Sequence, residues 1–377
     1  MICSLELENN IVKTGLCTSC GACQGLCPYW LSHRGKTIQL FSCDREEGRC
    51  YAFCPRTKTD LAKLREEFFP GADYIPEIGP FYGLYMTRAA DADIRAKSQH
   101  GGTTTALVEL AMRKGFIDAA ILTDAQGGVN PKGVLVKKPG DVRKYAGSSF
   151  QIPPVLATLN KALEKNKYKK IAVVGTPCKT LAVYKMKSRP FPDNDSNAGN
   201  IGMVFGLFCG WGLDWQGLEK LVQRHAAGKR VKHMDILPSK FHQMLLKTSK
   251  KEMEVPLEEI YPIVKGSCNY CIDMTAEFCD ISIGGARSSE GWDVDQGWNQ
   301  VIVRTEKGVK LMELAREKGI LEFKAVGKSN LEKIKQASLN KKKTGLKNLR
   351  KLSGSVKNLV YLDPDEPGVK KACHDIA

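Results

Sequence analysis

The amino-terminal cysteines have the spacing of iron–sulfur ligands. The first run reads Cys17-x2-Cys20-x2-Cys23-x3-Cys27, and Pro28 follows it. This is the bacterial ferredoxin motif, in which three thiolates on one loop bind one [4Fe–4S] cluster and the fourth cysteine reaches a second cluster. The spacing therefore predicts a segment that carries electrons.

A second cysteine run follows, and it is one ligand short. Cys43, Cys50 and Cys54 stand where four cysteines would be standard, and a proline again follows the last. If Cys54 completes the first cluster, the second cluster keeps only the last cysteine of the first run with Cys43 and Cys50. We expect two clusters in this module. Three solutions for the second remain open: a [3Fe–4S] centre, a fourth ligand from Asp44 or Cys3, or a different pairing of the cysteines.

A disulfide framework and a zinc ribbon are the main alternatives for these cysteines. The first ten residues, MICSLELENN, lack the basic start and apolar core of an export signal. Fourteen cysteines without such a signal indicate a reducing compartment, and we expect the chain to be cytoplasmic. Four-cysteine zinc sites rarely use the compact triple spacing of the first run. Iron–sulfur ligation is the interpretation that we favour.

Four further cysteines lie at predicted strand ends and turns. Cys178 and Cys209 each follow a predicted strand directly, and Cys268-x2-Cys271 forms a close pair. Together they supply the four thiolates that a [4Fe–4S] cluster needs. Zinc, a redox-active cysteine pair and ordinary buried cysteines remain alternatives, because spacing along the chain cannot show that the four residues meet in space.

The elements that must position these residues alternate between helix and strand from Leu84 onward. The apolar periodicity predicts a helix at 103–114, closed by a glycine, and another helix that begins near Cys178. Apolar runs predict strands at 116–123, 170–174, 201–208 and 300–305. This alternation predicts an α/β body, of mixed α+β character with a mixed or parallel sheet, behind a small ferredoxin-like domain.

The net charge of +16 is concentrated near the carboxyl terminus. Between Lys324 and Lys351 the sequence has ten lysines or arginines and the single acid Glu332. This segment is interpreted as a solvated surface, or as one that steers an acidic redox partner or a polyanionic coenzyme. No aromatic residue interleaves with the lysines, so nucleic-acid binding is not expected. The longest apolar stretch, 201–213, is shorter than the ~20 residues of a membrane-spanning helix, so no integral membrane segment is expected.

Several motifs together resemble the beta subunits of coenzyme F420-reducing hydrogenase and of the related formate dehydrogenase. They are SQHGGTTTALVELA, GTPC, FCG and CNYCIDMTAE, within a resemblance that covers about residues 80–310. Members of this family bind FAD beside a [4Fe–4S] cluster. They carry electrons between a metal-containing partner subunit and a two-electron acceptor. The resemblance thus implies iron–sulfur clusters, three here, and FAD as cofactors.

The resemblance also implies where the flavin binds. The expected contacts are Ser98, Gln99, His100, Gly101, Gly102 and Thr103, with Gly147, Ser148 and Ser149 from a second polar loop. Glycines and free amides before a helix allow a pyrophosphate or flavin edge to approach closely. The plain alternative is an ordinary helix N-cap. No GxGxxG motif follows a strand, so a conventional Rossmann site is not supported. We expect Cys3, Cys279 and Cys373 to be free thiols, and no catalytic residue is assigned.

The expected organisation follows from these assignments. Its parts are a double-cluster module at 1–70, a linker at 71–83, a flavin-binding part at 84–165, a part at 166–325 with the flavin-proximal cluster, and a basic tail at 326–377. We expect an oxidoreductase subunit that relays electrons through its clusters and FAD between a partner hydrogenase, formate dehydrogenase or acidic ferredoxin and a two-electron acceptor, here coenzyme F420. The alternatives are a flavin-free electron-transfer adaptor and a stand-alone ferredoxin-dependent reductase of another organic substrate, such as a tetrapyrrole.

Overall fold

An eight-stranded mixed sheet forms the centre of the computed structural model, which describes residues 3–125, 130–188, 197–227, 229, 231–236, 242–288, 295–355 and 357–374. The strand order is β15-β5-β14-β13-β9-β8-β6-β7. The bounds are β5 Gly83–Ala89, β6 Ala119–Asp124, β7 Lys132–Val136, β8 Ile171–Gly175, β9 Ile201–Leu207, β13 Ile281–Gly285, β14 Asn299–Val303 and β15 Leu321–Lys324. Strands β6, β8, β9 and β13 are parallel, and the outer strands are antiparallel to their neighbours. The predicted α/β class with a mixed sheet is confirmed.

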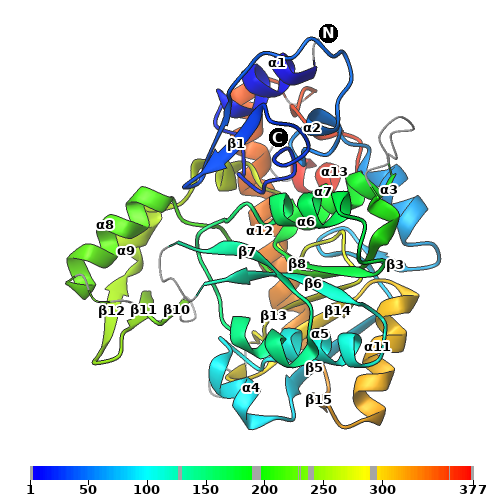
Figure 1. Cartoon of the computed structure of the whole chain (residues 1–377), viewed down its shortest axis with the longest axis vertical. Helices are drawn as coiled ribbons and strands as arrows, with labels where there is room; N and C mark the ends of the chain where they lie inside the picture. The colour runs from blue at the N-terminus through cyan, green and yellow to red at the C-terminus, as the bar shows by residue number, and fades with distance from the viewer. Residues whose placement is uncertain are drawn as a thin grey trace.

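Both faces of the parallel strands are buried, which explains their continuous apolar sequences. Successive side chains of a strand point to opposite faces. Ile121 of β6 thus joins a core cluster on one face, while Ala120 and Leu122 join another on the opposite face. Helices α6 (Val155–Glu164) and α7 (Pro177–Ser188) cover the first face (Figure 1).

The opposite face is covered by α5 and α11, with α4 beside them (Figure 1). Their bounds are α4 Ala92–Lys97, α5 Thr103–Arg113 and α11 Glu306–Glu317. Helix α5 lies within one residue of its predicted bounds and ends before Gly115, whose φ of +70° is one that glycine adopts easily. The strand predicted at 116–123 begins three residues late, because Phe116 and Ile117 donate backbone hydrogen bonds back to Ala111.

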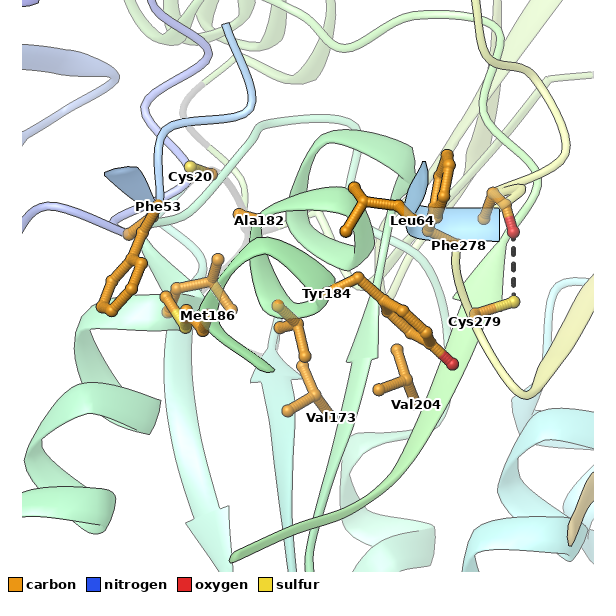
Figure 2. Close-up of a cluster of buried hydrophobic side chains, with 14 of the residues drawn as sticks. Cys20, Phe53, Leu64, Val173, Ala182, Tyr184, Met186, Val204, Phe278 and Cys279 are labelled. Carbon is orange, nitrogen blue, oxygen red and sulfur yellow. Dashed lines mark hydrogen bonds between the residues drawn. The ribbon is translucent and has the colours of Figure 1, made fainter. Parts of the chain in front are cut away.

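The amino-terminal module is made of short elements that pack on α6 and α7. They are α1 Cys3–Leu7, a π-helical turn Glu8–Val12, the hairpin β1 Trp30–His33 and β2 Lys36–Gln39, α2 Arg49–Ala52 and α3 Leu61–Phe68. Figure 2 shows Cys20, Phe53 and Leu64 of this module around Tyr184 and Met186 of α7. One hydrophobic core therefore joins the module to the body.

The segment predicted as a linker is ordered against the body. It contains a hairpin of β3 (Asp73–Ile75) and β4 (Gly79–Phe81). The fully buried Arg304 guanidinium donates to the carbonyls of Ile78 and Pro80, at 2.9 and 2.6 Å. These backbone contacts explain why the proline-rich stretch is held in place.

The segment predicted as a basic tail is also part of the folded body. It forms α12 (Lys328–Ser353) and α13 (Pro367–His374), and residues of both helices join the core beside α7. Lys342 is 2% exposed and forms an ion pair with the buried Glu277. The interpretation of the Lys324–Lys351 segment as solvated throughout is therefore wrong, since one side of α12 faces the protein.

A small lobe that the sequence did not predict projects from the body (Figure 1). It has its own apolar core and a three-stranded antiparallel sheet. Its elements are α8 Trp215–Ala226, β10 His233–Ile236, β11 Gln243–Lys247, β12 Glu252–Pro256 and α9 Leu257–Ile260. The remaining described elements are 3-10 turns at Pro139–Tyr145, Ala198–Asn200, Tyr261–Ile263 and Gly266–Tyr270. No helix in the described ranges is both long and apolar enough to span a bilayer.

Candidate functional site

All fourteen cysteines are free thiols, and twelve of them fall into three groups. The first group consists of Cys17, Cys20, Cys23 and Cys54, and all four line one cavity. Burial and the thiols of the other three members raise the pKa of Cys23 well above its ordinary value. The cavity and the soft sulfur donors around it fit an iron–sulfur cluster. Cys54 thus lies with the first run, as the ferredoxin motif predicts.

The loop of the first group is built by close backbone contacts with α6. A side chain at Gly21, whose φ is +86°, would lie 2.8 Å from the carbonyl oxygen of Pro154. The backbone N–H of Leu156 donates to the carbonyl of Cys20 at 3.1 Å, and the Asn160 amide donates to that of Ala22 at 3.0 Å. Helix α6 therefore fixes the loop that carries three of the four thiols.

The second group lies on the outer side of the module. It contains Cys27, Cys43 and Cys50, together with Cys3 from the amino terminus. Burial, Cys3 and Cys27 raise the pKa of Cys50 to about 12. Cys27 is exposed, whereas Cys3 is 3% exposed. The structure thus places a fourth thiol beside the three that the sequence assigned.

The third group brings together the four cysteines of the body. They are Cys178 in the first turn of α7, Cys209 directly after β9, and Cys268 and Cys271 in the turn around Gly266–Tyr270. Burial raises the pKa of Cys209 to about 12; Lys341 opposes this, and the other three thiols add to it. Strands β8 and β9 are parallel neighbours, so the residues after them emerge at the same edge of the sheet.

Backbone contacts hold the parts of the third group in register. The N–H of Gly212 donates to the Cys268 sulfur at 3.3 Å, and the N–H of Cys209 donates to the Met274 carbonyl at 2.8 Å. Helix α12 approaches the same turn, since a Cβ at Gly345 would lie 2.7 Å from the carbonyl oxygen of Cys271. Four thiols on three separate segments are thereby fixed by the fold.

The three groups are neighbours in the order second, first, third. The thiol of Cys50 helps to raise the pKa of Cys23, which relates the second group to the first. The thiol of Cys178 helps to raise the pKa of the buried Cys20, which relates the first group to the third. Within the described part of the chain, no three Cys, His, Asp or Glu side chains converge as ligands of a single metal ion. A [4Fe–4S] cluster instead bonds each of its four thiolates to a different iron.

Buried cations surround the first and third groups. Lys185 Nζ donates to the carbonyl of Cys54 at 2.7 Å and to two threonine hydroxyls. Arg56, 4% exposed, donates to the carbonyls of Ser267 and Tyr270 at 3.0 and 2.9 Å. Although burial acts in the other direction, Lys341 and Arg56 hold the pKa of Cys271 below its ordinary value. Such cations favour thiolate and an anionic cluster, and sequence reasoning missed them because they carry no motif.

The two predicted flavin loops meet. Ser148 Oγ donates to Gln99 Oε1, which joins the second loop to the first. Gln99 Nε2 donates to Asp235 Oδ1 of β10 at 2.5 Å. Burial raises the pKa of Asp235 above its ordinary value, although Gln99 and the nearby Arg287 act to lower it. Asp235 and Arg287 thus belong to this polar cluster, and the sequence analysis did not name them, since neither lies in a recognisable motif.

Some residues of these loops have structural partners instead. The fully buried Thr103 pairs its hydroxyl with that of Thr87 at 2.8 Å, and its N–H donates to Asn299 Oδ1 at 3.1 Å. Thr103 is the first residue of α5, whose N-cap is Gly102 without a capping side chain, so an ordinary Ser or Thr N-cap is not found here. Ser98 Oγ donates to the Ile94 carbonyl at 2.8 Å. Of the remaining members, Gly101 packs closely on Asn299, and Gly102, with a φ of +76°, is the N-cap of α5. Gly147 has a φ of +108°, and the Ser149 hydroxyl donates to the Gln151 carbonyl.

The polar cluster lies close to the third cysteine group at the end of β13. A Cβ at Gly285 would lie 2.6 Å from His100 Nε2, and one at Gly284 would overlap the ring of Phe208. Two adjacent glycines thus contact His100 of the polar cluster and the residue that directly precedes Cys209. Burial, together with nearby positive charge, lowers the pKa of His100 to about 4, so its ring is neutral near pH 7.

The cysteines outside the three groups are Cys279 and Cys373. Cys279 is fully buried and its thiol donates to the Ala276 carbonyl at 3.1 Å (Figure 2). Cys373 lies in α13 and packs against the core. Both lie outside the three groups, whereas the third cysteine for which a free thiol was expected, Cys3, lies with the second group.

Most of the chain is similar to known proteins. Residues 84–160 match the amino-terminal part, and residues 168–329 the carboxyl-terminal part, of the family described as coenzyme F420 hydrogenase/dehydrogenase, beta subunit. The chain is similar to the coenzyme F420 hydrogenase subunit beta of Methanococcus voltae, with 29% identity over 71% of this chain and 95% of that protein. It is 27% identical to a subunit of the F(420)H(2) dehydrogenase of Methanosarcina mazei, over 81% of this chain and 84% of that protein.

Two further relatives differ in how much of this chain they match. A coenzyme F420-dependent sulfite reductase of Methanocaldococcus jannaschii is 28% identical over 96% of this chain, which spans about half, 55%, of that protein. In structure, the chain resembles a chain of the F420-reducing [NiFe] hydrogenase complex from Methanosarcina barkeri, with a TM-score of 0.67 and 26% identity over 74% of this chain and 94% of that chain. The match to the sulfite reductase thus extends over nearly all of the chain.

Proposed function

Since this chain belongs to the family of coenzyme F420 hydrogenase/dehydrogenase beta subunits, we propose that it relays electrons through three [4Fe–4S] clusters and FAD between a redox partner and coenzyme F420. The observation that carries this proposal is the order of the sites. Three groups of free thiols follow one another, and the last lies near a polar cluster at the end of β13. Cofactors bound at neighbouring sites can pass electrons along the series, and the protein sets their positions.

The residues of each site have distinct tasks in this proposal. The first group would hold one cluster at its cavity, and the third group would hold the cluster next to the flavin. Gln99, His100, Ser148, Asp235 and Arg287 would bind the flavin. When bound, the clusters carry single electrons and FAD exchanges two electrons with an organic acceptor.

The protein's own charges support this assignment. A [4Fe–4S] cluster held by four thiolates is anionic, and burial of an anion is costly unless cations compensate it. Arg56, Lys185 and Lys341 provide buried positive charge beside these thiols. These buried cations therefore favour the binding of an anionic cluster at the first and third groups.

The outer end of the series suits a redox partner. The exposed Cys27 lies in the second group, and the hairpin of β1 and β2 follows it. Of the seven large hydrophobic side chains that are exposed among the described residues, five belong to this module: Leu5, Leu31, Ile38, Leu40 and Phe41. Exposed apolar side chains gathered in this way are typical of interaction surfaces. We assign this surface to the redox partner, whether a second subunit or a ferredoxin.

The test is anaerobic purification followed by cofactor analysis and electron transfer. We expect about twelve iron atoms, a similar amount of acid-labile sulfide and one FAD per chain, as three [4Fe–4S] clusters require. The dithionite-reduced protein should reduce coenzyme F420, measured by the loss of its absorbance, and should not reduce NAD(P). A chain with full iron but no flavin would be an adaptor. A flavoprotein that reduces a tetrapyrrole but not coenzyme F420 would be the stand-alone reductase.

A further inference from the structure

The second cysteine group, as the sequence assigns it, has one ligand fewer than a [4Fe–4S] cluster needs. The structure shows which candidate residue lies near its other cysteines. Six residues separate Cys43 from Cys50, and Asp44 is the one among them that the sequence analysis weighed as a ligand. Asp44 is exposed to solvent. Iron–sulfur clusters favour soft thiolate ligands over hard carboxylates, and the hydrated Asp44 carboxylate is therefore disfavoured.

Cys3, by contrast, lies beside Cys43 and Cys50, where a fourth ligand is needed. It begins α1, is 3% exposed, and its thiol lies close enough to the thiol of Cys50 for each to change the pKa of the other. Cys43 is also close enough to raise the pKa of Cys3. A Cβ at Gly48 would lie 2.9 Å from the Cys3 sulfur and 3.5 Å from the Cys50 sulfur. Both sulfurs thus lie against Gly48, and the absence of a side chain at this residue leaves space for them.

Specific contacts hold the amino terminus against the second cysteine run. The N–H of Cys3 donates to the Arg45 carbonyl at 3.1 Å, and Ser4 Oγ donates to the Cys43 carbonyl at 3.1 Å. Farther along α1, Glu6 accepts a 2.8 Å hydrogen bond from the Tyr51 hydroxyl. These contacts begin at Cys3 and continue along α1, so its thiol is positioned by the fold.

We propose that Cys3 is the fourth thiolate ligand of the outer cluster, with Cys27, Cys43 and Cys50. This rests on the proposed iron–sulfur function and completes it, because each of the three groups then has four thiolates. Four thiolates predict a [4Fe–4S] centre, whereas three would favour [3Fe–4S]. The ligand comes from the amino terminus in place of the missing cysteine of the second run.

The experiment compares the anaerobically purified protein with Cys3→Ala by iron and sulfide analysis, EPR and Mössbauer spectroscopy. The unmodified protein should show three [4Fe–4S] centres and no stoichiometric [3Fe–4S] signal. Cys3→Ala should either gain a [3Fe–4S] signal with the loss of about one iron, or lose the outer cluster with about a third of the iron. The matched control is Cys373→Ser, which removes a free thiol outside the three groups and should retain all the iron.

The outcomes separate this proposal from the proposed function. Full iron content and unchanged spectra in Cys3→Ala would overturn the role of Cys3 and leave the relay intact. A stoichiometric [3Fe–4S] signal in the unmodified protein would also overturn it, without any variant. Absence of iron from the unmodified protein would instead contradict the proposed function. The FAD content of Cys3→Ala shows whether the body of the variant is folded. If the variant lacks FAD, the spectra of the unmodified protein decide between a [4Fe–4S] and a [3Fe–4S] outer cluster.

Discussion

Lys341 on α12 donates a hydrogen bond of 2.5 Å to the backbone carbonyl of Cys209, which lies 132 residues earlier in the chain. This contact joins the last long helix to the third cysteine group. Burial acts to lower the pKa of Lys341, but the thiols of that group raise it above its ordinary value. The lysine therefore stays protonated beside these cysteines and belongs to their electrostatic environment.

Replacement of Lys341 by Met should make the potential of the third cluster more negative. Loss of a neighbouring cation stabilises the oxidised form, and we expect a shift of about 60 mV, a tenfold change in a one-electron equilibrium. EPR-monitored redox titration measures it. Lys347→Met, which removes an exposed charge from the same helix, is the control and should leave the potential unchanged. Equal potentials in the two variants would show that Lys341 does not act on the cluster.

Replacement of Lys342 by Met should destabilise the fold strongly. It leaves Glu277 buried without its partner, at a cost of about 3–5 kcal/mol. Thermal unfolding of the anaerobic holoprotein should show a clear fall in Tm, and the double variant with Glu277→Leu should recover part of it. Lys328→Met breaks the exposed Lys328–Glu332 pair of the same helix and should change the Tm little. A Lys342→Met Tm near that of the control contradicts this account.

Replacement of Gly285 by Ala should weaken flavin binding without affecting the clusters. The new methyl group would overlap His100 Nε2 and displace that side chain within the polar cluster that we assign to the flavin. We expect the FAD content to fall by half or more while iron and sulfide stay constant. Gly199→Ala is the control, because no atom lies within 4 Å of its Cβ position. Full FAD content in Gly285→Ala would place the flavin away from His100.

Polar substitutions on the hairpin should slow electron exchange with the partner. Leu40→Ser with Phe41→Ser removes two exposed apolar side chains, and loss of their burial at an interface should weaken binding about tenfold or more. The measurement is the dependence of the cluster reduction rate on partner concentration. Leu352→Ser, on the exposed part of α12, serves as the control. An unchanged rate in the hairpin variant would locate the partner elsewhere, provided that the iron content is intact.

The sequence predicted the third cysteine group because strand ends are visible in it. Strand β8 ends just before Cys178 and β9 just before Cys209, and parallel neighbours place such residues at one edge of the sheet. The pair at Cys268 and Cys271 has a spacing that can chelate a cluster. The mixed sheet itself followed from the alternation of helices and strands.

The rest depended on contacts between residues far apart in the chain. The charge pattern suggested that the segment Lys324–Lys351 is solvated, but Lys342 within it is paired with Glu277, 65 residues away. Similarly, Arg56 reaches carbonyls more than 200 residues later, and Asp235 meets Gln99 from a separate lobe. Composition and periodicity report on local segments, so they do not predict such pairs.

The core shared by the amino-terminal module and the body fixes the spacing between the cysteine groups that we propose as cluster sites. Leu16 and Phe53 of the module pack in one cluster with Tyr184 and Met186 of α7, and α6 holds the loop of the first group directly. Electron transfer within this chain therefore needs no swing of a tethered carrier domain. The internal rate should be insensitive to solvent viscosity, so that the encounter with the external partner alone responds to it.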